Sequence, residues 1–286
     1  MPLDKRAARS VSCGMVDLAQ FPAADLAAQL ARPTGEIGVA VGDYMNRINS
    51  RLIKAAYELL TPPPDGRVLE IGFGNGKLIG DVLAMAPGLT YAGVDVSDTM
   101  VREATKNNRA LVQQDRIKLR RAAVDRLPFP NAAFDRALAV NTIYFWPDQL
   151  SGLTEIRRVL RDDGFLVLAS MTPETSKQSS TARPEHGFRV PDRNSLELLH
   201  RHAGFKRVAC NLYEEEAKAS GRHDFPPGLS YGACALRLAA RAIARARLGS
   251  LLRWLTSLTR YVPFSFSFLH CGNLTPVDRF PPVIRD

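Results

Sequence analysis

The stretch VLEIGFGNGKL, Val68 to Leu78, runs from an apolar segment into three alternating glycines. Such segments are typical of nucleotide-binding turns, and each type of turn has its own spacing. A dinucleotide fingerprint, G-x-G-x-x-G, needs a glycine where this chain has Lys77. A phosphate loop, G-x-x-x-x-G-K-[ST], needs a glycine at Ile71 and a hydroxyl at Leu78. Both spacings fail, so neither of these two loops is expected here.

The pattern that remains is E-x-G-x-G-x-G, formed by Glu70, Gly72, Gly74 and Gly76. Glycines permit a tight turn and let the backbone approach a ligand closely, because no Cβ stands in the way. A carboxylate at the end of the preceding strand suits a ligand that carries an ammonium group. The pattern therefore predicts a nucleoside site that does not depend on a phosphate.

Short apolar segments alternate with helix-length amphipathic ones from Arg67 onward. This alternation predicts right-handed crossovers and a buried parallel sheet, and hence an α/β fold with a doubly wound, mostly parallel sheet and helices on both faces. Ser97 is expected to cap one of the helices. Strands are expected at 67–72, 90–96, 116–124, 134–141, 164–170 and 205–213, and helices at 43–60, 77–86, 97–111, 148–161 and 193–204.

The composition excludes several classes of protein. The four cysteines lie far apart and form no CxxC pair, which argues against a zinc site and a disulfide scaffold and favours a reducing compartment. No metal is expected. Neither a secretory signal nor a run of about 18 apolar residues occurs, so a cytoplasmic protein is predicted.

The positive charge is concentrated at the carboxyl end of the chain. Residues 221–286 contain nine arginines, no lysine and three aspartates, which is two thirds of the net charge of +9. A protein that coats nucleic acid would spread its charge more widely, so no nucleic-acid partner is expected.

Four segments in order resemble the motifs of class I S-adenosylmethionine-dependent methyltransferases, with a Rossmann-like fold. The glycine turn resembles motif I, and Asp95 ends the following strand in YAGVDVS. The segment VDRLPFPNAAFDRALAVN is similar to the LPF…FD region of the ubiquinone/menaquinone branch, and RRVLRDDGFLVLAS to its fifth strand. The resemblance covers roughly Ile37 to Leu212. It implies S-adenosylmethionine as cofactor and methyl transfer to a small-molecule acceptor by in-line displacement.

The resemblance divides the chain into a helical lead-in at 1–36, a methyltransferase domain at 37–220 and an Arg-rich helical extension at 221–286. The family's sheet ends in an antiparallel strand, for which 229–236 (LSYGACAL) is a candidate. Arg237, Arg241 and Arg245 share one face of a basic amphipathic helix. We expect this helix to pack on the domain, with peripheral contact to an anionic membrane as the alternative.

The resemblance also assigns the cofactor contacts, with one departure. Glu70 and the three glycines would bind S-adenosylmethionine, with Glu70 suited to its ammonium group, and Asp95 would accept from both ribose hydroxyls. The branch often has an aspartate four residues before the leucine of LPF, but that position is Ala123 here. Asp125 takes this role from a shifted backbone, or the adenine is held by backbone and apolar contacts. The full set of expected cofactor residues is Glu70, Gly72, Gly74, Gly76, Asp95, Val96, Asp125 and Asn141.

The segment VNTIYFW, residues 140–146, follows the fourth expected strand and should face the transfer site. Asn141 and Tyr144 have the N-x-x-Y spacing of the amino-methyltransferase motif N-P-P-Y, without its prolines. They are predicted catalytic residues, although the aromatic run is equally consistent with an apolar wall or core. On the preceding helix, Asn46 and Asn49 share a face that could close over the cofactor.

A base is needed when the acceptor is a neutral phenol or alcohol. His186, in a polar loop around 177–180 and beyond, is the preferred candidate over His200 and His202, which cannot share a helix face. Two other functions stay open: a non-catalytic module of the same fold that binds the cofactor or a partner, and a lipid or macromolecule methyltransferase that uses the basic tail.

Overall fold

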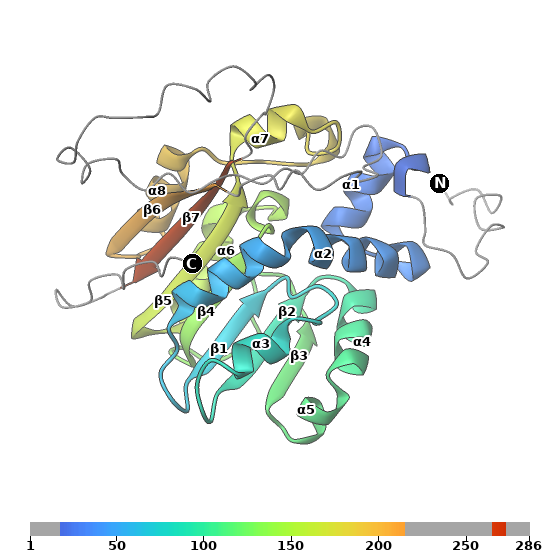
Figure 1. Ribbon diagram of the computed structural model, residues 1–286. Helices are drawn as coiled ribbons and strands as arrows, with labels where there is room; N and C mark the ends of the chain where they lie inside the picture. The colour runs from blue at the N-terminus through green and yellow to red at the C-terminus, as the bar shows by residue number, and fades with distance from the viewer. Residues whose placement is uncertain (1–17, 215–264, 273–286) are drawn as a thin grey trace, which may run out of the picture.

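A computed structural model of the protein describes residues 18–214 and 265–272. The chain folds around one seven-stranded sheet (Figure 1). The strand order is β3-β2-β1-β4-β5-β7-β6. The first five strands pair in parallel, whereas β7 is antiparallel to both β5 and β6. The strands are β1 (Arg67–Ile71), β2 (Thr90–Asp95), β3 (Ile117–Arg121), β4 (Phe134–Val140), β5 (Leu160–Met171), β6 (Arg207–Glu214) and β7 (Ser265–Gly272).

The central strands are apolar because helices cover the sheet on both faces (Figure 1). Residues 164–171 of β5 are buried without a break, and Leu69, Leu138 and Leu166 have no exposed surface. The helices are α1 (Ala23–Ala31), α2 (Gly35–Leu60), α3 (Ile79–Leu83), α4 (Asp98–Asn107), α5 (Arg109–Gln113), α6 (Gln149–Val159), α7 (Pro173–Gln178) and α8 (Arg193–His202). Short 3-10 turns are η2 (Leu18–Gln20), η3 (Ile143–Phe145) and η4 (Pro184–His186). The predicted α/β, Rossmann-like doubly wound fold is confirmed.

Several helix boundaries depart from the predictions. The Ser97 hydroxyl accepts the N–H of Met100 at 3.1 Å, as expected of a cap, but the predicted helix at 97–111 is interrupted at Asn108. The helix expected at 77–86 is shortened to α3, because the glycine turn extends as far as Leu78. The polar loop expected around 177–180 begins as a helix, α7, since Pro173 is preorganised for a first helical turn and Thr172 caps it.

Helix α2 is longer than predicted and positions the site. It begins at Gly35 and ends at Leu60, where Thr61 takes a left-handed conformation before three prolines. Figure 1 shows α2 lying across the sheet, with α1 beside its N-terminal end. Asn49 and Leu52 on its inner face are buried, whereas Arg47 and Arg51 on the outer face are exposed.

The last strand of the sheet is not the segment that the sequence offered. Strand β7, Ser265–Gly272, lies between β5 and β6 and is the antiparallel strand for which 229–236 was the candidate. Seven consecutive residues of β5 pair with it, from Phe165 with Gly272 to Met171 with Phe266. The segment 229–236 and the predicted basic helix lie outside the described residues. Alternating aromatic and polar residues, SFSFLH, are the signal for β7.

Within the described ranges, no helix is long and apolar enough to span a membrane. In the same ranges, no three His, Cys, Asp or Glu side chains gather as metal ligands would.

Candidate functional site

A cavity of about 380 Å³ opens at the carboxyl ends of β1, β2 and β4. Strand ends of this kind are where open α/β sheets bind their ligands, and the volume suits a small molecule. The segments after the three strands supply its floor, and α2 together with the end of α1 covers it. The lining residues include all of the predicted cofactor residues except Asp125.

Glycine is favoured at three positions of the turn after β1 by its backbone conformation, and at two of them also by lack of space. Gly72, Gly74 and Gly76 have φ angles of +75°, +59° and +69°, in the left-handed region. A Cβ on Gly72 would lie 2.4 Å from Cγ2 of Thr142, and one on Gly76 would lie 2.6 Å from Cβ of Ala104. The turn therefore lies directly against the segment after β4 and against α4.

A polar cluster holds α2 to this turn, and sequence reasoning missed it. Asn75, at 1% exposure, donates from Nδ2 to Asp43 Oδ1 at 2.6 Å and accepts from Asn46 Nδ2. Lys77 Nζ pairs with the same Asp43 oxygen at 2.6 Å. Lys77, which distinguishes the turn from a dinucleotide fingerprint, thus contacts the covering helix. The signal was an asparagine inside the glycine turn, where a side chain can reach nearby backbone and helix groups.

Glu70 is a buried carboxyl on the cavity floor. Its Oε2 accepts the hydroxyl proton of Tyr91 at 2.7 Å. Burial raises the pKa of Glu70 to about 7, and the hydrogen bond from Tyr91 opposes that rise only in part. The carboxyl is thus poised to become charged when a cation enters the cavity.

Asp95, at the end of β2, is the second carboxyl of the cavity. Its Oδ2 accepts from the N–H of Gly74 at 3.1 Å and its Oδ1 from the N–H of Ser97 at 2.8 Å. Burial raises the pKa of Asp95 to about 6, although these backbone donors favour the charged form. Val96 follows with 39% exposure and also lines the cavity. Glu70, the glycine turn and Asp95 are therefore brought together as the sequence predicted.

The segment after β3 reaches the cavity through apolar residues rather than through Asp125. Ala122, Ala123 and Val124 line the cavity, whereas Asp125 is exposed and lies outside the lining. The structure therefore does not place Asp125 in the predicted cofactor site. Of the two possibilities left open, it favours apolar and backbone contacts.

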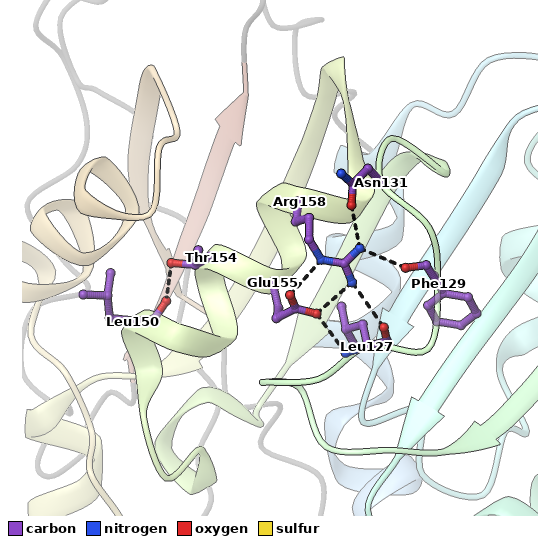
Figure 2. Close-up of polar contacts among 7 residues, drawn as sticks. All are labelled: Leu127, Phe129, Asn131, Leu150, Thr154, Glu155 and Arg158. Atoms are coloured by element: carbon purple, nitrogen blue, oxygen red, sulfur yellow. Dashed lines mark hydrogen bonds and ion pairs between the residues drawn. The ribbon is translucent and has the colours of Figure 1, made fainter.

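The chain just beyond this segment is fixed to α6 by one arginine. Arg158 binds Glu155 through two nitrogens, at 2.7 and 2.8 Å, and donates to the carbonyls of Leu127 and Phe129 and to Asn131 Oδ1 (Figure 2). Glu155 in turn accepts the N–H of Leu127 at 2.9 Å, and its pKa is lowered, chiefly by the Arg158 hydrogen bond. The LPF motif is thus a structural anchor for the cavity wall.

Asn141 lies where β4 meets the cavity. Its φ is +54°, and its Nδ2 donates to Oδ1 of Asn49 on α2 at 3.3 Å. Its own Oδ1 and the neighbouring Thr142 Oγ1 are buried without a partner among the described residues. A buried acceptor without a donor is costly, so a ligand that donates there would stabilise the site.

Aromatic residues build the wall beyond Asn141. Tyr144 and Phe188 stack with ring centroids 5.2 Å apart, and Phe145 meets both edge-on at 4.7 Å. Trp146 completes this aromatic wall. The expectation of an apolar wall is therefore the one that the structure supports for Tyr144, Phe145 and Trp146. Phe188, which the sequence reasoning did not single out, joins them from 44 residues beyond Tyr144.

The three histidines considered as bases, His186, His200 and His202, are not among the residues that line the cavity. His186 Nδ1 lies 3.0 Å from the carbonyl of Thr181, and its side chain is not part of the lining. His200 is buried against Phe205, where burial lowers its pKa to about 4, and His202 is exposed. The structure thus does not place His186 at the transfer site.

Comparison with known proteins agrees with this geometry. Residues 69–168 match the family described as methyltransferase domain. An O-methyltransferase of Pyrenophora dematioidea is 29% identical over 156 residues, which are 53% of this chain and 58% of that protein. A ubiquinone/menaquinone biosynthesis C-methyltransferase of Citrifermentans bemidjiense is 28% identical over 142 residues, covering 46% of this chain and 59% of that one. The chain thus spans about six tenths of the length of these curated relatives.

A solved structure described as a SAM-dependent methyltransferase of Thermotoga maritima has the same fold, with a TM-score of 0.52. It is 18% identical, and the match covers 81% of this chain and 94% of that chain. The match at 69–168 thus identifies a methyltransferase domain within the chain, and the solved structure shows that its fold is one found in a SAM-dependent methyltransferase.

Proposed function

We propose that this protein binds S-adenosylmethionine in the cavity and transfers its methyl group to a small-molecule acceptor. One observation carries the proposal: two buried carboxyls, Glu70 and Asp95, flank a glycine turn in the left-handed conformation at the floor of one cavity. The matched methyltransferase domain supports it.

The residues present fit the cofactor. S-adenosylmethionine donates through an ammonium group and two ribose hydroxyls, and the cavity offers acceptors at Glu70, Asp95 and Asn141 Oδ1. Glu70 would hold the ammonium group and Asp95 the hydroxyls, while Val96 and Val124 would contact the adenine. Because the three glycines carry no Cβ, backbone atoms of the turn can contact the ligand directly.

When bound, the cofactor supplies an electrophilic methyl group on a sulfonium. The protein's own task is to hold donor and acceptor in line and to exclude water. Helix α2 excludes water because it covers the cavity, and Asn75 and Asp43 fix it to the glycine turn. Asn141 and Tyr144 would position the acceptor. The described lining contains no histidine, and a neutral phenol or alcohol would need a base from another group.

A screen with labelled cofactor tests the proposal against a non-catalytic module of the same fold. Phenols, enols, amines and thiols would be offered with methyl-labelled S-adenosylmethionine, and product would be followed by transferred label. The proposal expects turnover of at least one class and loss of turnover in Tyr144→Ala with cofactor affinity kept. Tight cofactor binding without label transfer to any class would favour the non-catalytic module.

A further inference from the structure

Tyr91, near the start of β2, is the one hydrogen-bond partner that the described residues give to the Glu70 carboxyl. Its hydroxyl donates to Glu70 Oε2 at 2.7 Å, and Tyr91 and Glu70 are 2% and 6% exposed. The other oxygen, Oε1, has no described hydrogen bond, and it is not one of the fully enclosed atoms without a partner. Because Glu70 lines the cavity, Oε1 is the oxygen that a ligand there can reach. Tyr91 itself is not among the described lining residues, so it acts on a ligand only through Glu70.

The strand register brings the two side chains together. Glu70 on β1 lies opposite Gly93 on β2, and Tyr91 comes two residues before Gly93, on the same face of the sheet. A Cβ at Gly93 would lie 3.0 Å from Cε1 of Tyr91 and 2.4 Å from Cδ1 of Phe73. The Tyr91 ring therefore extends along β2 beside the space that a side chain at 93 would fill, and its hydroxyl reaches the carboxyl on the neighbouring strand. On the other side of Glu70, β4 contributes the apolar Leu138.

Among the described groups around Glu70, the Tyr91 hydroxyl favours the charged form. Burial is the main reason that the pKa of Glu70 is raised; the hydrogen bond from Tyr91 opposes the rise, and the charge of Asp95 adds to it. From α2, Tyr57 is close enough that Glu70 contributes to raising its pKa, after burial and ahead of Asp81, so Tyr57 is a neutral phenol at neutral pH. Tyr91 therefore differs from Tyr57 in that its hydroxyl donates directly to the carboxyl.

We propose that Tyr91 is a positioning residue for the cofactor: it holds Glu70 Oε2, leaves Oε1 for the cavity, and thereby sets the preference of the site for a ligand that carries an ammonium group. The inference rests on the proposed function, since S-adenosylmethionine and its product carry that group. When the ammonium group enters, Glu70 loses its proton to solvent, and the Tyr91 hydroxyl stabilises the carboxylate that remains. Binding of an ammonium ligand is therefore coupled to proton release.

Calorimetry of the full chain with two ligands tests this coupling. S-adenosylhomocysteine carries the ammonium group, whereas methylthioadenosine has the same nucleoside and thioether without it. Both carry the ribose hydroxyls, so the difference between them removes the contribution of Asp95. Titrations in two buffers of different ionisation enthalpy give the number of protons released. Because the pKa of Glu70 is about 7, S-adenosylhomocysteine should release about 0.8 proton more than methylthioadenosine at pH 6, about 0.5 at pH 7 and about 0.1 at pH 8.

Tyr91→Phe removes the hydroxyl and keeps the ring. Loss of one hydrogen bond to a charged group should raise the pKa of Glu70 from about 7 to about 8. The excess release at pH 8 should therefore increase from about 0.1 to about 0.5 proton. The affinity for S-adenosylhomocysteine should fall about fivefold at pH 7 and only about twofold at pH 8, while that for methylthioadenosine stays within about twofold at both.

Two further variants identify the groups. Tyr57→Phe removes a hydroxyl from the same surroundings but keeps the hydrogen bond to Glu70, so the excess release at pH 8 should stay at about 0.1 proton. Glu70→Gln removes the titrating group, so the excess release should vanish at every pH. Denaturant unfolding checks that each variant is folded under the conditions of binding.

Separate readings keep the two ideas apart. Failure of both ligands to bind the unmodified protein would overturn the proposed function. Binding of both ligands, with no excess release from S-adenosylhomocysteine at pH 6, would overturn the inference without any variant. A Tyr91→Phe variant that weakens both ligands equally at pH 7 and pH 8 would also overturn it, because that is the result of a purely structural role.

Discussion

The two sides of the cavity differ in how the chain builds them. The carboxyl side consists of Glu70, the glycine turn and Asp95, and it depends on backbone conformation within 26 residues of sequence. The aromatic wall depends on side-chain packing between η3 and Phe188, which comes from beyond β5 and α7. The carboxyl side can therefore be recognised in the sequence from the spacing of its residue types, whereas the aromatic wall forms only through tertiary contacts.

The two sides also contribute differently to the stability of the fold. Burying Glu70 and Asp95 disfavours their charged forms, so the carboxyl side is destabilising until a ligand that donates hydrogen bonds arrives. The aromatic wall is apolar and stabilises the fold whether or not a ligand is present. Substitutions on the two sides should therefore change stability and cofactor affinity in different proportions.

The largest effect on stability is expected for Phe188→Ala. The ring is 2% exposed and stacks on Tyr144, so its loss leaves a cavity and should lower the free energy of unfolding by about 3–5 kcal/mol. Denaturant unfolding would measure this. Affinity for S-adenosylhomocysteine, measured well below the midpoint, should change less than about threefold. A parallel collapse of cofactor affinity would break the separation between the two sides.

Alanine substitutions at two glycines of the turn, Gly72 and Gly74, test its contact with the segment after β4. Gly72→Ala puts a Cβ in the left-handed region and 2.4 Å from Thr142 Cγ2, and should cost about 2–4 kcal/mol. Gly74→Ala has the same kind of φ angle but no atom within 4 Å, and should cost about 1–2 kcal/mol. Unfolding in denaturant compares the two.

Adding Thr142→Ser, which removes Cγ2, should recover part of the loss in Gly72→Ala and none in Gly74→Ala. Equal costs at the two glycines, unchanged by that second substitution, would show that the contact between the turn and the segment after β4 is unimportant.

Glu70 predicts a pH effect with a definite sign. Its pKa is raised from 4.5 to about 7, so between these values the native state binds more protons than the unfolded state, and stability falls as pH rises. The loss from this carboxyl is complete above pH 7 and amounts to about 3 kcal/mol. Without cofactor, the stability of Glu70→Gln relative to the unmodified protein should therefore increase as the pH is raised from 4.5 to 8. The same variant should bind S-adenosylmethionine less tightly. An equal stability difference at both pH values would contradict the burial of this charge.

The smallest effect is expected for Lys77→Ala. Lys77 and Asp43 are about half exposed, so their ion pair contributes little, and stability should change by no more than about 0.5 kcal/mol. The affinity for S-adenosylhomocysteine should stay within about twofold, as calorimetry would show. A loss of tenfold or more would mean that this lysine contacts the ligand, as it does in a phosphate loop.

The sequence predicted the elements whose residue types are dictated locally. The glycines at 72, 74 and 76 were recognisable because their φ angles admit few other residues, and Asp95 because it ends a strand beside them. Asp125 and His186 were predicted from their place in the chain, and neither lines the cavity. Asp125 lies two residues beyond Ala123, the position at which the family often has an aspartate, and a shift of two residues can turn a side chain away from the cavity. The candidate for the last strand was 229–236, because the alternation at 265–270 indicates a strand but does not show that this strand pairs with β5.

Phe188 and Asn75 were missed for a related reason. Phe188 meets Tyr144 only after β5, α7 and η4 have folded, and the Asn75 contacts require α2 to lie across the turn. Neither contact follows from periodicity or spacing along the chain.

The central claim, that the carboxyl side holds the cofactor, is tested most directly by calorimetry of S-adenosylhomocysteine with two aspartate variants. Asp95→Ala removes a buried carboxyl of the cavity, and Asp125→Ala removes an exposed one from the neighbouring loop. The account predicts an affinity at least about tenfold weaker in Asp95→Ala, because charge-assisted hydrogen bonds to the ribose are lost, and an unchanged affinity in Asp125→Ala. Undiminished binding in Asp95→Ala, with both variants folded, would contradict it.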